Sequence, residues 1–245
     1  MAYHPFDITG ADRPGPWLIT CDHAANTVPP VVTGATLGLP QADMKRHIAF
    51  DIGAKGTALA LGAALNAPVI CSNFSRLVID PNRGLDDPTL VMMLYDGTII
   101  PANRALTEAD RQARIDACYA PYHLALAELA ARPGALILSI HSFTPQLRGR
   151  APRPWEVGVL SASDRRLADP LIALLRGDLQ SPVGDNEPYA GHLPGDAVDQ
   201  HALQHGRPNV LIELRQDLIT TEEGQRAWAQ RLAPHLEAAR KTANL

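Results

Sequence analysis

The sequence predicts an α/β protein, a three-layer sandwich in which helices cover a mixed, mostly parallel central sheet. Short apolar runs of strand length alternate along the chain with longer segments of helical periodicity. This alternation is typical of parallel sheets whose strands are joined by crossover helices. The chain has 245 residues, of which 46% are hydrophobic and 20% charged, enough for one large core. We therefore expect a single catalytic domain over residues 1–245.

Five apolar runs are expected to form the main strands. The third is entered from a Pro-Gly turn and reads as a buried strand of six residues. A shorter apolar run at residues 77–79 ends in a Pro- and Gly-containing turn that aims polar groups at one spot. The five runs are residues 16–21, 68–71, 135–140, 155–160 and 209–212.

Four segments are expected to be helical. The Ala- and Leu-rich stretch 41–65 is expected to break near residues 51–53. The helix after Thr107 has apolar positions at a 3.6-residue period and acidic residues in its first turn. The others cover residues 165–176 and 222–240, the latter capped by Thr220 or Thr221. Residues 177–208 have little regular pattern, and a long loop of this kind predicts a substrate-facing segment.

Charge and composition exclude several classes of partner. The net charge of −4 and the pI near 6.1 disfavour nucleic acid and anionic membranes, which need a basic face. No apolar run is long enough for a membrane span, and the N-terminus has no signal-peptide pattern, so we expect a cytoplasmic protein. The three cysteines are too few and too widely spaced for a disulfide framework or a zinc knuckle. A small-molecule substrate fits best.

Polar residues that can bind a metal or transfer a proton follow three of the predicted strands. Asp22 and His23 follow the first, His141 the third and Glu213 the last. Ligands of open α/β sheets bind outside the carboxyl ends of the strands. These positions therefore predict metal binding and base catalysis there.

Five motifs in order resemble the N-formylglutamate amidohydrolase family, and through it the zinc carboxypeptidase fold. Together they span roughly residues 17–220, and their order is more specific than any one of them. The motifs are residues 22–26 (DHAAN), 75–84 (SRLVIDPNRG), 153–155 (RPW), 186–191 (NEPYAG) and 213–217 (ELRQD), with the His141 run HSFTPQL between them.

The resemblance implies a catalytic zinc, which needs about three protein ligands and a water. His23 and His141 supply two nitrogens. The carboxypeptidase pattern has a Glu three residues after the first histidine, where this chain has Asn26. Asp51 is our choice for the third ligand because a carboxylate suits zinc better than an amide, with Asp22 and His47 as alternatives. Cobalt or manganese would also suit this ligand set.

The same resemblance assigns the reaction and the substrate contacts. Glu213 is expected to be the general base and acid, the alternative being a structural ion pair with Arg215. Arg76 is expected to stabilise the oxyanion or to help to bind an anionic substrate, the alternative for the arginines being a surface salt bridge with Asp80 or Asp86. The remaining substrate contacts are assigned to Asn82 and Arg83 on a carboxylate, Tyr189 and Ser142.

Three functions compete. The leading one is a metal-dependent amidohydrolase that cleaves the N-acyl (formyl) amide of an acidic amino acid such as N-formyl-L-glutamate. A peptidase of the same fold is disfavoured because a chain this short leaves little room for a peptide groove. A binding protein that lost its metal is favoured by Asn26 and opposed by the intact set of His23, His141 and Glu213. No Gly-rich phosphate loop is present, and the sequence does not indicate an oligomeric state.

Overall fold

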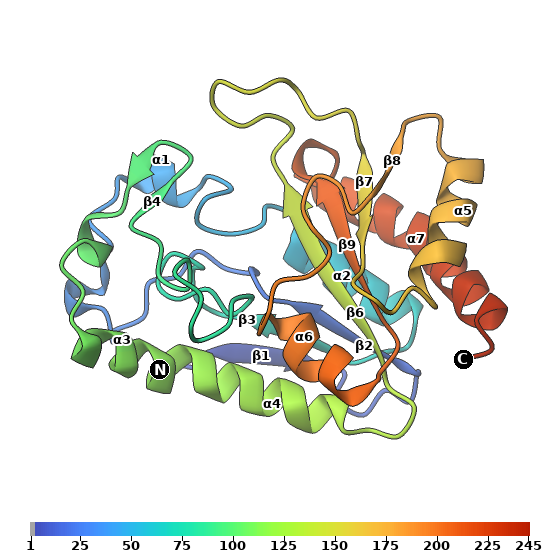
Figure 1. The fold of residues 1–245 in the computed structure, drawn as a ribbon, viewed down its shortest axis with the longest axis horizontal. Helices are drawn as coiled ribbons and strands as arrows, with labels where there is room; N and C mark the ends of the chain where they lie inside the picture. Colours follow the sequence, from blue (N-terminus) through green and yellow to red (C-terminus); the bar gives the residue numbers. More distant parts are fainter. Residues whose placement is uncertain (1–2) are drawn as a thin grey trace.

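A computed structural model describes residues 3–245 as an α/β sandwich built on a seven-stranded sheet (Figure 1). The strand order is β1-β3-β2-β6-β9-β7-β8. Four neighbouring pairs are parallel and two, β1 with β3 and β7 with β9, are antiparallel. The strands are β1 (Phe6–Thr9), β2 (Trp17–Cys21), β3 (Val69–Ser72), β6 (Leu136–Phe143), β7 (Val157–Leu160), β8 (Val183–Asp185) and β9 (Asn209–Arg215). The predicted mixed, mostly parallel sheet is confirmed.

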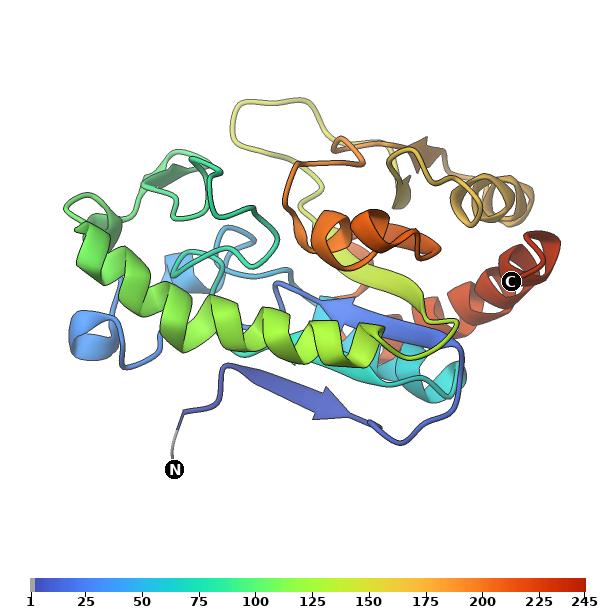
Figure 2. The same cartoon turned by 60° about the horizontal axis from the view of Figure 1, so that its bottom comes forward.

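Helices cover both faces of this sheet (Figure 2). One face packs against α2, α5 and α7, the other against α4 and α6. The α-helices are α1 (Gln41–Met44), α2 (Ala54–Ala64), α3 (Glu108–Arg114), α4 (Ala120–Ala130), α5 (Ala168–Asp178), α6 (Ala197–His201) and α7 (Glu222–Thr242). The three predicted layers are therefore present.

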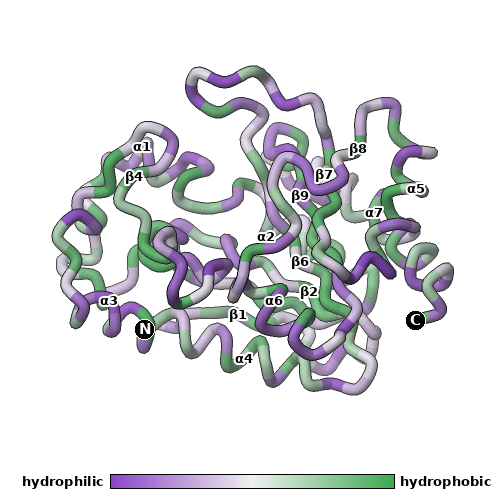
Figure 3. Tube along the Cα trace, in the orientation of Figure 1, coloured by the Kyte–Doolittle hydropathy of each residue, from purple (hydrophilic) through white to green (hydrophobic). Residues whose placement is uncertain are grey.

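Alternation along the central strands decides which side chains reach the site. Ile140 and Ile212 belong to the core beneath α2, α5 and α7, so His141 and Glu213 point to the opposite face, toward α4 and α6. β6 and β9 are parallel neighbours whose register places His141 beside Glu213. Figure 3 shows that the central strands are largely hydrophobic and the loops around them more hydrophilic.

Several predicted elements have different boundaries. Residues 177–208 are not one irregular loop, because they contain β8, α6 and a 3-10 turn, Leu203–His205. The apolar run at residues 77–79 is irregular and overlaps a turn at residues 76–78. The helix after Thr107 has a π-helical turn at Ile115–Tyr119, which joins α3 to α4. Its first turn is closed by a capping box between Thr107 and Asp110.

Two small strand elements escaped the sequence analysis. β1 is an edge strand with three of its four residues exposed, so it lacks a continuous apolar run. The hairpin of β4 (Leu94–Tyr95) and β5 (Thr98–Ile99) turns at Asp96-Gly97, both with positive φ. Among residues 3–245, no helix is both long and apolar enough to cross a membrane.

Candidate metal centre and active site

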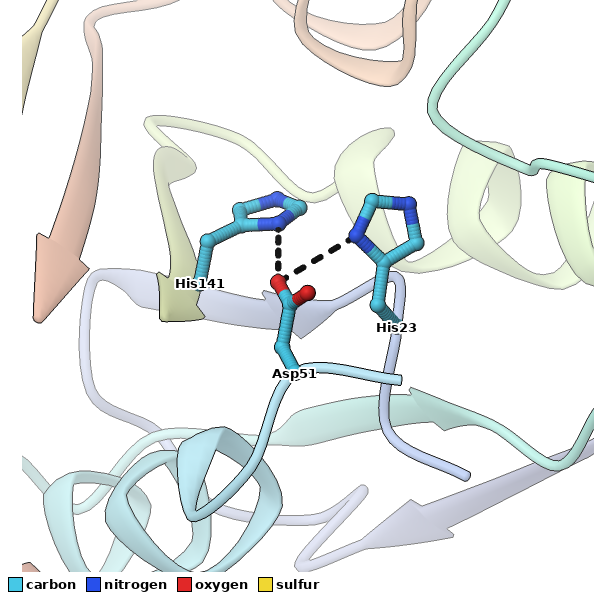
Figure 4. Close-up of side chains that lie close together, drawn as sticks. All are labelled: His23, Asp51 and His141. Carbon is cyan, nitrogen blue, oxygen red and sulfur yellow. Dashed lines mark hydrogen bonds and ion pairs between the residues drawn. The ribbon is translucent and has the colours of Figure 1, made fainter. Parts of the chain in front are cut away.

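Three buried side chains from separate segments converge at one end of the sheet (Figure 4). His23 follows β2, His141 lies in β6 and Asp51 stands three residues before α2. One oxygen of Asp51, Oδ2, lies 3.2 Å from His23 Nδ1 and 2.9 Å from His141 Nδ1. These atoms are close enough to bind a single ion, as the sequence predicted for these three residues.

The backbone around Asp51 fixes its carboxylate against the sheet. Its N–H donates to the carbonyl of His23 at 2.9 Å, and Ser142 N donates to Oδ2 at 3.3 Å. Gly53 then turns the chain into α2 with φ 81°. A β-carbon on Gly53 would clash with the carbonyl of Ile219, so this tight turn requires glycine.

A second carboxylate lies behind each histidine. His23 Nε2 is 2.7 Å from Asp80 Oδ1, and His141 Nε2 is 3.2 Å from Asp22 Oδ2. Tyr122 OH donates to the other oxygen of Asp22 at 2.5 Å. Carboxylates behind ligating histidines are typical of metal sites, since they orient the ring and fix its tautomer. Asp22, an alternative candidate ligand, therefore lies behind His141 and not beside Asp51.

The donor set fits a divalent metal. Both Nδ1 atoms face Asp51 while both Nε2 atoms face outer carboxylates, so the rings are oriented as ligands. Although burial opposes it, the neighbouring histidines hold the pKa of Asp51 below its usual value, so that it stays anionic. Two imidazoles and a carboxylate suit zinc with an open position for water. Asn26 is not among the residues that line the cavity, and its Nδ2 donates to Met44 O at 2.7 Å.

Glu213 lies beside this cluster with one oxygen unpaired. The residue is buried, and Oε2 has no hydrogen-bond partner within residues 3–245. Burial raises the pKa of Glu213 to about 7, although His141 opposes the shift. Arg215, its alternative partner, donates instead to Asp217 Oδ1 at 2.8 Å. The structural ion pair between Glu213 and Arg215 is therefore absent.

Arg76 extends from the turn after β3 to the edge of the cluster. Its Nε and Nη2 donate to Asp80 Oδ2 at 3.1 and 2.7 Å. Its Nη1 lies 3.7 Å from Asp51 Oδ1, beyond hydrogen-bond distance. The guanidinium also stacks over the ring of Tyr95, 5.4 Å from its centroid. Asp80 thus holds His23 and Arg76 with its two oxygens, and Nη1 of Arg76 has no hydrogen bond to any of residues 3–245.

One cavity of about 260 Å³ unites these groups with the predicted substrate residues. Asn82 and Arg83 line it from the turn after Asp80, and Tyr189 lines it from the loop after β8. Ser142 lines it too, but its hydroxyl donates to the carbonyl of Ile52 at 2.8 Å. Its backbone N–H holds Asp51 as described above. All nine site residues predicted from the sequence therefore border one cavity: His23, Asp51, Arg76, Asn82, Arg83, His141, Ser142, Tyr189 and Glu213.

Comparison with known proteins assigns the family. A sequence model described as N-formylglutamate amidohydrolase matches residues 15–220. The chain belongs to this family. It is accordingly a hydrolase of amide carbon–nitrogen bonds, as the sequence predicted.

Two solved structures share the fold of this chain. A gene product of Agrobacterium tumefaciens is 35% identical with a TM-score of 0.91, the alignment covering 98% of this chain and 96% of that one. An N-formylglutamate amidohydrolase from Ralstonia eutropha JMP134 is 23% identical with a TM-score of 0.66, covering 98% of each chain, and shares the fold. No curated protein sequence gives a significant match.

Within this amidohydrolase, sequence reasoning missed residues that support the site. Asp80 was considered only as an ion-pair partner of an arginine, although it also holds His23. His47, an alternative ligand, lines the cavity with Nε2 3.4 Å from Asp96. Arg153 was noted as part of a motif without a role. Its Nη1 donates to Tyr189 OH at 3.1 Å, and its guanidinium lies 4.9 Å from that ring's centroid.

Proposed function

We propose that this protein is a metal-dependent amidohydrolase that cleaves the N-acyl amide of an N-acyl amino acid. The family name makes N-formyl-L-glutamate, an acidic amino acid derivative, the reference substrate. One observation carries the proposal. A metal-type triad, a buried carboxylate with an unpaired oxygen and two arginines open into a single cavity.

His23, Asp51 and His141 would hold the metal, zinc or another divalent ion. Such an ion supplies a water of lowered pKa and polarises the carbonyl to be attacked. Asp22 and Asp80 keep both rings turned with Nδ1 toward Asp51. This support, from opposite sides, favours a preformed site.

Glu213 would move the proton. Its unpaired Oε2 can accept a proton from water and return it to the departing amine nitrogen. A pKa raised by burial toward neutrality suits both roles, since the group must take up and release a proton in one cycle. Glu213 lies beside His141 in the sheet, which supports its proposed role as the base next to the metal.

The two arginines would divide substrate binding. Nη1 of Arg76, beside Asp51, is available to the developing oxyanion. Arg83 donates through Nε to Thr89 and through Nη1 to the carbonyl of Asn82, which leaves Nη2 for the α-carboxylate. The Tyr189 hydroxyl accepts a bond from Arg153, so its own proton can be donated to the substrate.

The size of the cavity supports a small substrate. About 260 Å³ suits an acyl amino acid and is below the usual range for ligand pockets, which favours a single residue over an extended peptide. The site also retains every group that the reaction needs, which disfavours a binding protein without chemistry.

The test is an assay of zinc-loaded protein on N-formyl amino acids, with release of the free amino acid as the readout. We expect turnover that is lost on chelation and restored by metal. Metal analysis should find about one ion per chain. Absence of turnover on every N-acyl amino acid tested would overturn the proposal.

A further inference from the structure

The turn that carries Asn82 and Arg83, which we call the carboxylate clamp, lies directly against the start of α6. Ala197 N donates to Asn82 Oδ1 at 3.3 Å. Next to this contact, Gly84 and Gly195 meet backbone to backbone, and a β-carbon on Gly195 would lie 2.9 Å from Gly84 Cα. A substrate whose α-carboxylate binds Asn82 and Arg83 must therefore place its side chain near the loop that leads into α6.

The cavity wall at this place is mostly apolar. Leu193 and Val198 contribute from the loop and from α6, and Leu160 and Leu211 from the sheet. Leu160 and Leu211 are paired in the register of β7 and β9. Leu211 stands two residues before Glu213, so both side chains lie on the same face of β9. We call Leu160, Leu193, Asp196, Val198 and Leu211 the side-chain wall.

The sheet is shaped to bring this loop close. Gly158 lies beside Glu213 in the β7–β9 register. A β-carbon at Gly158 would meet the carbonyl of Glu187 at 2.0 Å, and one at Gly184 would meet it at 2.6 Å. The loop therefore rests on bare backbone next to the strand position of the base.

The one charged member of the side-chain wall is an anion. Asp196 caps α6, with Oδ1 accepting from Asp199 N at 2.7 Å and Oδ2 from Leu193 N at 3.1 Å. Within residues 3–245 it forms no ion pair with a cation. Apart from histidines, the cations that line the cavity are Arg76, engaged by Asp80, and Arg83 of the clamp, while Arg153 stacks on the lining rings of Phe143 and Tyr189 and is engaged by the Tyr189 hydroxyl. A second substrate carboxylate at this wall would be buried beside Asp196 without a partner, which is costly.

We infer that the side-chain wall selects N-acyl amino acids with apolar side chains and discriminates against a side-chain carboxylate. This inference rests on the proposed amidohydrolase function and changes only the amino acid that it prefers. The α-carboxylate binds Asn82 and Arg83, the acyl carbonyl faces the triad and Arg76, and leucine- or methionine-sized groups pack on Leu193, Val198 and Leu211. Glutamate is a poorer fit than its neutral isostere glutamine.

A substrate series tests the inference directly. With zinc-loaded protein, kcat/KM should fall in the order N-formyl-leucine or -methionine, N-formyl-glutamine, N-formyl-glutamate, with at least a tenfold span. Glutamine isolates the charge because its shape matches glutamate. A kcat/KM for N-formyl-glutamate equal to or above that for N-formyl-leucine would overturn the inference while it supported the proposed function.

Binding measurements separate the two proposals if turnover fails. The thermal shift of zinc-loaded protein with N-formyl-leucine should then exceed that with N-formyl-glutamate at equal concentration. This result would retain the side-chain wall and reject the reaction. An equal or reversed shift would reject the wall as well.

Variants locate the effect. Asp196→Asn keeps a capping side chain on α6 and should raise kcat/KM for N-formyl-glutamate relative to N-formyl-leucine about three- to tenfold. Leu193→Ala should lower kcat/KM for N-formyl-leucine about tenfold and leave kcat/KM for N-formyl-glutamate nearly unchanged. Asp199→Asn, on the same helix but outside the cavity lining, is the matched control and should leave the ratio unchanged. An unchanged ratio in both Asp196→Asn and Leu193→Ala would contradict the inference.

Discussion

The two sides of the cavity are built in different ways. The metal side consists of His23, Asp51 and His141 with Asp22 and Asp80 behind them, all buried and linked to one another. The side-chain wall takes Leu193 and Asp196 from a loop that lies on glycines. The first region is held by contacts between buried histidines and carboxylates at the end of the sheet, whereas Leu193 and Asp196 of the second are held by close contact between loops. Changes to the metal side should therefore affect the chemistry, and changes to the wall the choice of substrate.

The largest effect is expected at Glu213. Glu213→Gln keeps the shape but removes the proton acceptor, so kcat should fall by roughly two to four orders of magnitude. Metal content and substrate binding should be unchanged. Steady-state kinetics with metal analysis checks this, with Glu156→Gln, outside the cavity, as a control. Normal turnover in Glu213→Gln would refute the mechanism.

The next effect concerns the metal ligands. His23→Ala, His141→Ala and Asp51→Ala should each lower metal affinity at least tenfold, since each removes one donor. Asn26→Ala should leave metal affinity nearly unchanged because its side chain holds Met44. Metal titration of the chelated proteins provides the measurement. A greater loss of metal affinity in Asn26→Ala than in Asp51→Ala would assign the third ligand to Asn26 or its neighbours.

The arginines should separate the two sides of the cavity. Arg76→Ala should act mainly on kcat, and Arg83→Ala mainly on KM, each by about ten- to a hundredfold. The reason is that Nη1 of Arg76 lies beside Asp51, whereas Arg83 belongs to the clamp. Kinetics of both variants on one N-formyl amino acid would show the split. If Arg76→Ala and Arg83→Ala changed kcat and KM in the same way, the separate roles of the two arginines would be contradicted.

A smaller effect concerns how α6 is held as pH falls. His123 on α4 and His201 on α6 are buried, with His123 Nδ1 2.8 Å from His201 Nε2. Burial lowers the pKa of each to about 4. The unfolded chain protonates histidine near pH 6.5, so between about pH 6.5 and 4 it binds protons that the folded chain does not. The contribution of this pair to the free energy of unfolding should decrease as pH falls through this window and then level off.

The measurement compares chelated wild type with His201→Gln, which removes one titrating group but keeps a donor. Between pH 7.5 and 5 the Tm of the wild type should fall by a few degrees more than that of the variant. Chelation excludes contributions from proton competition for metal. Parallel curves would show that the histidine pair does not titrate in this window.

Sequence reasoning succeeded where chemistry follows a buried strand. His141 and Glu213 lie on β6 and β9, whose apolar runs are unambiguous, and Asp51 was chosen from ligand chemistry and the family pattern. The role of Asp80 is harder to predict because it depends on a contact with His23, which lies 57 positions earlier in the sequence.

The missed elements share a different physical cause. β1 is an edge strand with three of its four residues exposed, so it lacks the alternation of apolar and polar residues that marks a half-buried strand. β8 and α6 are short and are held by glycine contacts and caps that no hydrophobic pattern encodes. The Asp96-Gly97 dipeptide was a readable hairpin signal that was overlooked.

The register of β6 and β9 has a further consequence for how the protein can evolve. His141 and Glu213 are neighbours across one pair of hydrogen-bonded strands, so backbone spacing, about 4.8 Å between strands, sets their separation. No loop length enters that distance. A one-residue shift in the register of β6 against β9 would turn one of the two side chains to the opposite face of the sheet. The register therefore cannot change gradually without loss of the pair. Insertions in the loop before α6 can meanwhile accumulate without altering this spacing, which allows new substrates to be explored while the reaction is inherited intact.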